Sequence, residues 1–479
     1  MSRRRRLLFA LAVVALLGAG AAVVFYLKEV RPPGDVFNAD VPFDDTPEAT
    51  PTPTPTPARP QRRKVDTFVW PQYGYTDQHR RVFQPSGDVG PPFRRVWRRT
   101  ASELLEFPPS IARGMLFQLA DDGWLTARAK RTGKIRWKRK VGRLAASTPA
   151  VEGPNLYVTV LDTGGGRGRA LSLRLRNGRI RWSRALPSRT ESSPLVDNGR
   201  MYFGSEDGTL YCVDEATGRT VWTYRAAGSV KGSPTLAYGL LYFGDYGGQV
   251  QAVKASNGHR VWANGSARGL VRSGTFYATA AVAFGRVYIG STDGREYSFS
   301  AKTGRLAWAH QTGNYVYSSA AVQDVPGLGP TVYFGSYDAT FYALDARTGA
   351  VRWQHDSGGR ISGSPTIVGD VVYFASLGRR KTIGLAVRTG KRVFGPMEGG
   401  FDPVVSDGTY LYLTGYKTIS ALVPRRAAAR QRTATRARAA ARQRAAARKR
   451  AAARQRAAAR KRAAARKRAA ARRRAQNQR

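Results

Sequence analysis

The middle of the chain is a succession of short segments in which apolar and polar residues alternate. Residues 192–224 contain four of them, at 192–196, 201–204, 210–214 and 220–224. A period of two predicts β-strands that are buried on one face. Asn198-Gly199, Asp207-Gly208 and Thr217-Gly218 separate the segments, and such pairs favour tight turns because glycine adopts positive φ. The stretch therefore predicts one four-stranded antiparallel sheet.

This layout recurs, marked by a glycine followed four residues later by an aromatic residue. The copies are Gly133/Trp137, Gly178/Trp182, Gly218/Trp222, Gly258/Trp262, Gly304/Trp308, Gly349/Trp353 and Gly390/Phe394, with Trp97 one period upstream without the glycine. Successive aromatic residues are 40 to 46 positions apart, a spacing typical of propeller blades. We expect all eight aromatic side chains, Trp97 and Phe394 included, to dock between neighbouring blades as part of the core.

The two ends of the repeat array complement each other. Seven full blades occupy residues of about 104 to 397, whereas 402–422 supply only three strands. Residues 93–99 read as a single outer strand, and donating it to the last sheet closes the ring and removes its open edges. The predicted fold is an all-β, eight-bladed propeller of four-stranded blades, closed by an N-terminal strand, over residues 67–424.

The N-terminus carries a membrane-anchor pattern. Arg3–Arg6 precede an uninterrupted apolar run at residues 7–27. As a helix this run spans about 31 Å, the thickness of a bilayer core, and the arginines favour a cytoplasmic N-terminus. We predict a single-pass bacterial cell-membrane protein with residues 1–6 inside and the propeller and C-terminus outside the cytoplasm. A cleaved signal peptide ending near Ala19-Gly20-Ala21 is the alternative.

Two low-complexity segments flank the propeller. Residues 28–66 are rich in proline and threonine, which predicts an extended stalk that holds the propeller off the membrane. Residues 425–479 hold 23 of the 79 basic residues and no acidic one, mostly in Ala-Ala-Ala-Arg hexads. They predict a fluctuating cationic helix or a disordered tail. Counterion release favours anionic cell-wall polymers or lipids as its ligand, and nucleic acid is disfavoured by the extracytoplasmic topology.

The repeat resembles a known family. Tyr342-Ala343-Leu344-Asp345-Ala346-Arg347-Thr348-Gly349-Ala350-Val351-Arg352-Trp353 is similar to the tryptophan-docking motif of pyrroloquinoline-quinone (PQQ) repeat propellers. That family includes quinoprotein dehydrogenases and the propeller lipoprotein of the outer-membrane protein assembly machine. The resemblance implies an envelope propeller, and it leaves a PQQ-dependent dehydrogenase-like redox protein as the alternative function. Departures are Asn177 and Asn257 in place of threonine, and Phe394 in place of tryptophan.

Residues for catalysis are sparse. Cys212 is the only cysteine, so a thiolate cluster or a disulfide cap is excluded within the chain. Glu191 and Asp402 are the acids expected at inner-strand entries, whereas Ca²⁺ prefers several oxygen ligands. No Ser/His/Asp grouping or phosphate loop is found. We therefore expect no enzyme activity, no metal site, and neither PQQ nor Ca²⁺ as a cofactor.

The loops that enter the inner strands form one mouth of the channel. Counting along the repeat places six side chains there: Arg189, Glu191, Lys231, Tyr315, Tyr317 and Arg360, with Arg143, Arg268, Arg272 and Tyr277 nearby. Cations interleaved with tyrosines are typical of a site for an anionic, carbohydrate-like or peptide partner; the alternative is that they are ordinary solvated rim residues of a basic protein. The predicted function is a non-catalytic, membrane-anchored scaffold of the cell envelope that binds a protein or polymer.

Overall fold

The computed structural model describes residues 35–45, 66–87, 89–266 and 274–425. The predicted membrane segment 7–27 and the tail from residue 426 onward lie outside these ranges. Contacts divide the chain into two units, 1–423 and 424–479, and of the second unit only Pro424 and Arg425 are described. In the described ranges, no helix has the length and apolar character that crossing a bilayer requires.

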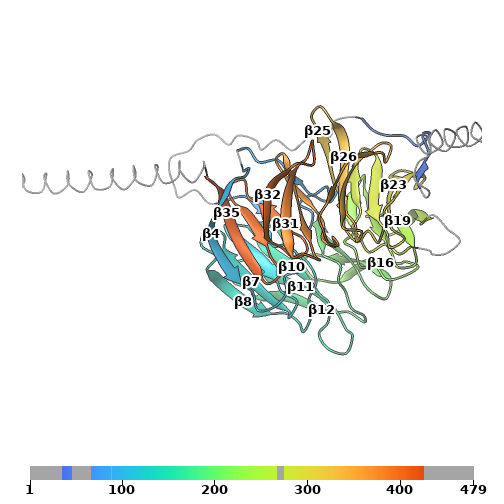
Figure 1. Ribbon diagram of the computed structural model, residues 1–479. Coiled ribbons are helices and arrows are strands. Elements are labelled where there is room, and N and C mark those ends of the chain that lie inside the picture. Colours follow the sequence, from blue (N-terminus) through green and yellow to red (C-terminus); the bar gives the residue numbers. More distant parts are fainter. Residues whose placement is uncertain (1–34, 46–65, 88, 267–273, 426–479) are drawn as a thin grey trace, which may run out of the picture. The chain divides into compact units, whose positions relative to one another are not determined.

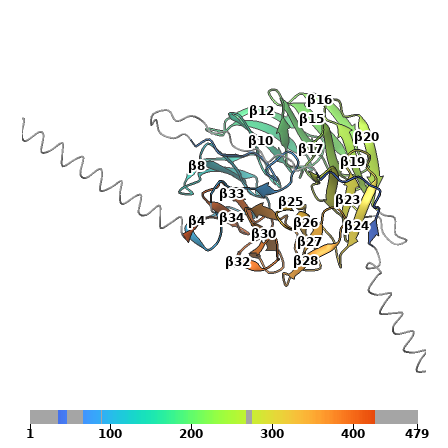
Figure 2. The ribbon, with the colours of Figure 1, turned by 90° about the horizontal axis from the view of Figure 1, so that it is seen from above.

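Eight antiparallel sheets are arranged around a central axis (Figures 1 and 2). Blade 1 contains β5 (Ser110–Ala112), β6 (Met115–Leu119), β7 (Trp124–Ala129) and β8 (Ile135–Lys140). Blade 2 contains β9 (Ala150–Glu152), β10 (Asn155–Val160), β11 (Arg169–Arg174) and β12 (Ile180–Ala185). Blade 3 contains β13 (Leu195–Asp197), β14 (Arg200–Gly204), β15 (Thr209–Asp214) and β16 (Thr220–Arg225). Blade 4 contains β17 (Thr235–Ala237), β18 (Leu240–Gly244), β19 (Gln249–Lys254) and β20 (Arg260–Gly265).

The second half repeats the pattern. Blade 5 contains β21 (Ala281–Ala283), β22 (Arg286–Gly290), β23 (Arg295–Ser300) and β24 (Leu306–Gln311). Blade 6 contains β25 (Ala321–Val325), β26 (Gly329–Gly335), β27 (Thr340–Asp345) and β28 (Val351–Asp356). Blade 7 contains β29 (Thr366–Val368), β30 (Val371–Ser376), β31 (Lys381–Ala386) and β32 (Arg392–Glu398). Blade 8 contains β33 (Val404–Ser406), β34 (Leu411–Thr414), β35 (Thr418–Pro424) and β4 (Phe93–Thr100). The first strand of each blade lies nearest the axis.

The predicted ring closure is confirmed. Strand β4 comes before blade 1 in the sequence, yet it is the outer strand of blade 8, next to β35. The backbone N–H of Ala101 donates a 2.8 Å hydrogen bond to the carbonyl of Lys417 just after β4. The first and last segments of the propeller therefore share one sheet, and the ring closes without an incomplete blade.

Blades are joined by tryptophans that pack on glycines. Seven indole Nε1 groups donate hydrogen bonds of 2.9–3.1 Å to carbonyls of the next blade: Trp97 to Lys130, Trp137 to Leu175, Trp182 to Glu215, Trp222 to Ala255, Trp262 to Ala301, Trp308 to Ala346 and Trp353 to Val387. Each ring also covers the signature glycine of that next blade, where a Cβ would approach the ring to 2.5–2.9 Å. Phe394 has no indole donor and packs against Phe93 at 5.5 Å between ring centroids.

A second set of contacts links the blades near the axis. Two residues before an inner strand, a side-chain oxygen accepts a backbone N–H from the preceding blade. The pairs are Thr148 to Ser193, Ser233 to Thr279, Thr279 to Ser319, Ser319 to Ser364 and Ser364 to Asp402, with distances of 2.6–3.1 Å. Serine and threonine therefore precede the inner strands because they connect blades, in addition to being small enough for the crowded axis.

The segment before β4 closes one end of the channel. We call residues 66–87 the plug; it contains β2 (Val69–Trp70), which pairs with β5, and β3 (Val82–Phe83), which pairs with β29. Between these strands, its carbonyls accept hydrogen bonds of 2.7–3.0 Å from inner-strand N–H groups of blades 2, 4, 5, 6 and 7. The plug therefore satisfies backbone donors that face the axis, and it was not predicted from the sequence.

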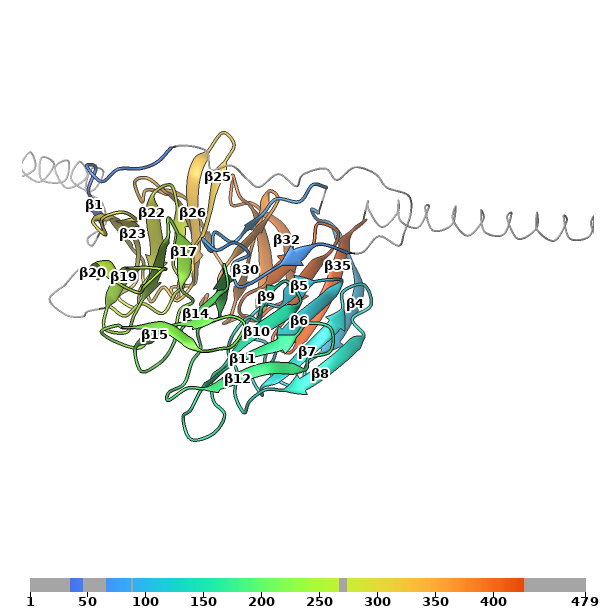
Figure 3. The same ribbon diagram turned by 180° about the vertical axis from the view of Figure 1, so that it is seen from behind.

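The N-terminal segment also differs from the expected stalk. We call residues 35–45 the strap; its strand β1 (Val36–Phe37) pairs with β24 on the outer edge of blade 5 (Figure 3). Val41 is buried, and the buried Arg286 donates to the carbonyls of Val41 and Pro42 at 2.6 and 2.7 Å. Residues 46–65 thus have the strap at one end and the plug at the other. The Thr-Pro repeat, which lies outside the described residues, is therefore flanked on both sides by segments that pack on the propeller.

The tryptophan–glycine contact is testable with a matched pair of glycines. Gly218 and Gly199 have φ of +72° and +76°, but a Cβ would lie 2.6 Å from Trp182 at Gly218 and would meet nothing within 4 Å at Gly199. We expect Gly199→Ala to lose about 1–2 kcal/mol of unfolding free energy from backbone strain. Gly218→Ala is expected to show the same loss from strain and a further loss of about 1–3 kcal/mol, because the added methyl group overpacks against Trp182. Equal losses in urea denaturation would show that the indole contact contributes nothing.

Candidate functional site

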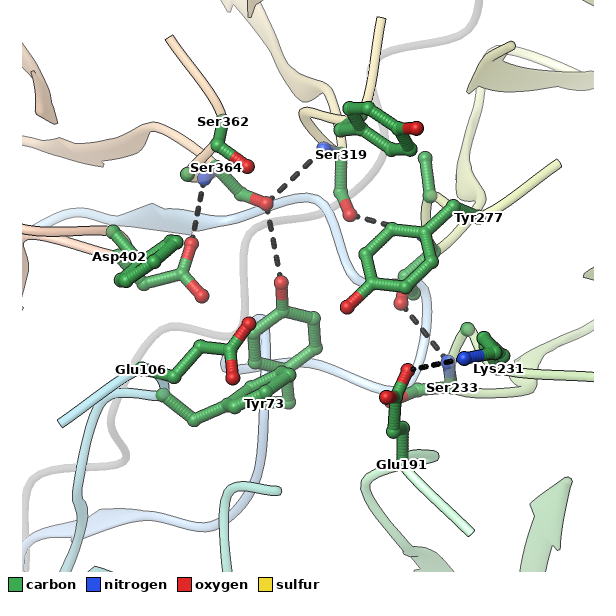
Figure 4. Close-up of a pocket in the computed structure, with 17 residues that line it drawn as sticks. Tyr73, Glu106, Glu191, Lys231, Ser233, Tyr277, Ser319, Ser362, Ser364 and Asp402 are labelled. Carbon is green, nitrogen blue, oxygen red and sulfur yellow. Dashed lines mark hydrogen bonds and ion pairs between the residues drawn. The ribbon is translucent and has the colours of Figure 1, made fainter. Parts of the chain in front are cut away.

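A pocket of about 460 Å³, including space open to solvent, lies where the loops that enter the inner strands meet the plug. It is lined by residues from successive blade entries (Figure 4). Six of them stand four residues before an inner strand: Glu106, Glu191, Lys231, Tyr277, Tyr317 and Ser362. The repeat thus places one side chain from each of six blades around the opening. This set of side chains differs from blade to blade, so the mouth is chemically asymmetric.

The plug supplies the floor of the pocket. The hydroxyl of Tyr73 lies 3.1 Å from Ser364 Oγ, and the guanidinium of Arg81 lies 4.0 Å from the centre of the Tyr73 ring. Asp402 is buried beside them and accepts the backbone N–H of Ser364 at 2.6 Å. Burial raises the pKa of Asp402, and the positive charge of Arg81 opposes that shift. Plug and blades therefore share one polar cluster under the pocket.

The cations of the mouth are paired with acids. Lys231 Nζ lies 3.3 Å from Glu191 and 3.0 Å from Glu206, and Arg189 lies 3.7 Å from Glu206. Burial lowers the pKa of Lys231, but these two carboxylates outweigh that effect and raise it. The sequence interpretation treated Arg189 and Lys231 as cations available to an anionic partner. Their charges are instead largely compensated within the protein, so this side of the mouth is not a cationic collar.

Tyrosines form the other side of the mouth. Tyr317 lies at the centre, with ring-centroid distances of 5.5 Å to Tyr277, 5.8 Å to Tyr315 and 5.0 Å to Tyr337. Tyr246 adjoins Tyr277 at 6.5 Å, and the guanidinium of Arg360 lies 5.9 Å from the Tyr337 ring. Aromatic faces with hydroxyl edges contact apolar and hydrogen-bonding groups at the same time.

One carboxyl group in the pocket is kept protonated at neutral pH. Burial raises the pKa of Glu106 to about 8, and the neighbouring carboxylates of Asp121, Glu191 and Asp402 add to the increase. Burial likewise raises the pKa of Asp121 to about 7. A neutral Glu106 presents both a hydrogen-bond donor and an acceptor to the pocket.

The predicted mouth residues are therefore brought together only in part. Glu191, Lys231, Tyr317 and Tyr277 line the pocket, whereas Arg189, Tyr315 and Arg360 are not among its lining residues. Arg143 is exposed and is not among the lining residues, and Arg268 and Arg272 lie outside the described residues. Sequence reasoning missed Glu106 and the plug residue Tyr73. Counting four residues back from every inner strand would have found Glu106, whereas no repeat register applies to Tyr73.

The pocket residues do not fit a calcium–quinone pair. Ca²⁺ binds six to eight oxygen ligands, usually with several carboxylates. Among the described residues, no three acidic, histidine or cysteine side chains are grouped to share an ion. Glu191 is paired with Lys231, and Asp402 accepts a backbone N–H. Glu106 has a pKa of about 8 and is therefore protonated at neutral pH. Each acid is thus committed to another interaction or neutral.

Comparison with known proteins identifies related repeats. The family model described as outer membrane protein assembly factor BamB matches residues 94–196, 188–327 and 318–395. Together these ranges cover more than half of the chain. No curated protein matches it.

Solved structures share the fold at low sequence identity. BamB from Moraxella catarrhalis is 18% identical, with a TM-score of 0.56 over 70% of this chain and 98% of that chain. The quinohemoprotein alcohol dehydrogenase ADHIIG from Pseudomonas putida HK5 is 15% identical, with a TM-score of 0.64 over 74% and 80%. The computationally designed Ika8 protein is 14% identical, with a TM-score of 0.57 over 69% and 99%. This likeness shows the fold, which is common to an assembly factor and a dehydrogenase.

The raised pKa of Glu106 makes a pH-dependent prediction. Its usual value is 4.5 and its folded-state value is about 8, so the folded protein loses stability as pH rises from 4.5 to 8. Glu106→Gln removes that penalty. We expect the variant to exceed the wild type in unfolding free energy by at most a few kcal/mol at pH 9, and the difference to shrink towards pH 4.

The control for this measurement is Asp370→Asn, which changes an exposed carboxyl in the turn between β29 and β30. Its difference from the wild type is expected to stay within about 0.5 kcal/mol across the same pH range. If the Glu106→Gln difference is also constant with pH, Glu106 is not protonated in the folded protein at neutral pH.

Proposed function

This chain belongs to the family described as outer membrane protein assembly factor BamB, and from that membership we propose that it is a non-catalytic interaction scaffold of the bacterial cell envelope. The propeller binds a partner protein at the mouth described above. One observation carries the proposal: the axis has a plugged end and an open end whose charges are already paired. Such a pocket offers surface for recognition without a set of reactive groups.

The mouth suits an extended polypeptide. The five tyrosines contact side chains and peptide planes, while the neutral Glu106 and the hydroxyls of Ser233 and Ser319 offer hydrogen bonds. Aromatic residues bury large areas with little loss of rotamer freedom, which is why they concentrate binding energy at interfaces. Paired charges such as Lys231 with Glu191 and Glu206 provide specificity at the rim.

We further propose that residues 7–27 anchor the protein in the membrane and that the propeller lies outside the cytoplasm. Only residues 28–34 separate the end of that segment from the strap, and a fully extended connection of this length reaches about 28 Å. The strap is held on blade 5 by β1 and by the ion pair of Asp40 with Arg305, and its end reaches blade 6 through the ion pair of Asp45 with Arg347. Blade 5 is therefore the part of the propeller that this anchor keeps nearest the bilayer.

The tail from Arg425 onward is proposed to bind anionic envelope polymers or lipid headgroups by counterion release. Its charge and its lack of aromatic residues support that role over sequence-specific recognition of nucleic acid.

A quinone-dependent dehydrogenase is the competing function, supported by the shared propeller fold. The committed acids of the pocket argue against it. We expect added PQQ and Ca²⁺ to leave no bound chromophore after gel filtration and to give no dye-linked alcohol oxidation. A stoichiometric quinone absorbance that co-elutes with the protein would replace the scaffold proposal with the redox function.

The scaffold proposal is tested by a photo-crosslinking amino acid at Tyr317 in intact cells. We expect a discrete protein adduct from this position and none from Tyr238, which is 60% exposed in the β17–β18 turn away from the mouth. Tyr337→Ala should lower the yield of the same adduct roughly fivefold or more, because an aromatic anchor contributes about 1–2 kcal/mol. Equal adduct patterns from Tyr317 and Tyr238 would contradict binding at the mouth.

A further inference from the structure

Positive charge is concentrated on one sector of the propeller. Residues 93–186, which form β4 and blades 1 and 2, hold 21 basic and 6 acidic residues. Residues 187–424 are more than twice as long and hold 23 basic and 17 acidic residues. The net charge is therefore +15 in the first range and +6 in the second. The repeat itself does not explain this difference, because all blades share the same strands and turns.

Twelve cations of this sector are exposed and make no side-chain hydrogen bond or ion pair among the described residues. They are Arg94, Arg95, Arg113, Arg131, Lys134, Arg136, Lys138, Arg143, Arg167, Arg174, Arg176 and Arg179. Blades 3 and 6 behave differently, since Arg200 pairs with Asp214, Arg225 with Asp207 and Arg352 with Asp345. The cations of blades 1 and 2 have not been balanced by acids in the same way.

Four of the twelve converge on a surface pocket of about 1280 Å³, including space open to solvent. Arg113 comes from the β5–β6 turn, and Arg174, Arg176 and Arg179 come from the end of β11 and the turn to β12. Met115, Pro154 and Leu175 supply apolar walls, and Asn177 adds an amide. Inner strands run away from the mouth, so the turns that follow β5 and β11 lie on the opposite face.

We propose that this arginine pocket binds a linear phosphate-containing polymer of the cell envelope, with the remaining exposed cations of β4 and blades 1 and 2 following the chain outward. Guanidinium groups bind phosphate oxygens in a two-pronged geometry, and the apolar walls suit the carbon units between phosphates. Because the pocket and the mouth lie on opposite faces, both can be occupied at once. The assignment of the polymer to the cell envelope rests on the location proposed above. The preference for phosphate rests only on the arginines and apolar walls of the pocket.

Two other anionic partners fit less well. A membrane surface would favour apolar side chains specific to this sector, but the exposed Ile135 and Ile180 have a counterpart at Val351 in blade 6, and blades 3 and 4 expose Val221 and Val261 one position later. Single-stranded nucleic acid is held by stacking on aromatic rings. The nearby Trp137 and Trp182 instead cover glycines of the next blade and donate their indole hydrogen bonds there.

The clustered charges also predict a change in stability. Like charges around one pocket repel one another and lower the stability of the compact state unless an anion neutralises them. Replacing Arg113, Arg174, Arg176 and Arg179 with glutamine is therefore expected to maintain or raise the melting temperature without ligand. A purely structural role for these arginines would lower it.

The binding test uses the full-length protein in detergent and long-chain inorganic polyphosphate as the probe. The matched control replaces Arg219, Lys254, Arg260 and Lys302 with glutamine, which removes the same charge from the corresponding hairpins of blades 3, 4 and 5. We expect the pocket variant to bind roughly tenfold more weakly, and the slope of log affinity against log salt to fall by about 3, at about 0.7 per lost contact. The control should keep most of both values.

Equal losses in the two variants would overturn the proposal, because they would indicate attraction to net charge alone. The proposal would also be overturned if the pocket variant bound polyphosphate as well as the wild type does but lost its retention on vesicles with 30% phosphatidylglycerol or on single-stranded DNA. Failure of crosslinking at Tyr317 would count against the mouth but not against the arginine pocket.

Discussion

The contact between a tryptophan and the glycine of the next blade is the constraint on which the propeller depends. Blades 1 to 6 each provide a glycine for the preceding indole and an indole for the following glycine, while blade 7 provides only the glycine Gly390 and blade 8 only the indole of Trp97. The hydrogen bond from Nε1 to a backbone carbonyl fixes the ring in one orientation. A chain of such contacts must end somewhere, and β4 provides that end by placing Trp97 in blade 8, facing blade 1.

Closing the ring creates the functional geometry as a consequence. Eight inner strands leave a channel with backbone donors facing it, and the plug satisfies several of them at one end. The other end remains a pocket in which charges sit close to the low-dielectric core. Acids there either acquire a cation, as Glu191 does with Lys231, or hold their proton, as Glu106 does. Unpaired charge is tolerated on the outer hairpins, where water screens it.

The periodic part of the structure was predictable, because turns, alternation and the glycine–tryptophan spacing are local signals repeated many times. Blade number, strand order and the closing strand follow from them. The plug and the strap were not, because Trp70, Tyr73 and Val41 form single, long-range contacts with no repeat to reveal them. The position of the mouth was predictable from the repeat, but the pairing of its cations with acids was not. The contact of Lys231 with Glu206 joins two blades and has no signal in the sequence.

Departures from symmetry are therefore the best guide to function in this fold. Packing demands a glycine at 178 and 218 and an indole at 182 and 222, but it leaves the neighbouring exposed positions unrestricted. At Arg176 and Ala216, two residues before each glycine, blade 2 has a cation where blade 3 has none. The same holds at the mouth, where equivalent positions carry Glu106, Lys231 or Tyr317. Side chains that the scaffold does not require, yet which gather at one place, need a ligand rather than the fold to account for them.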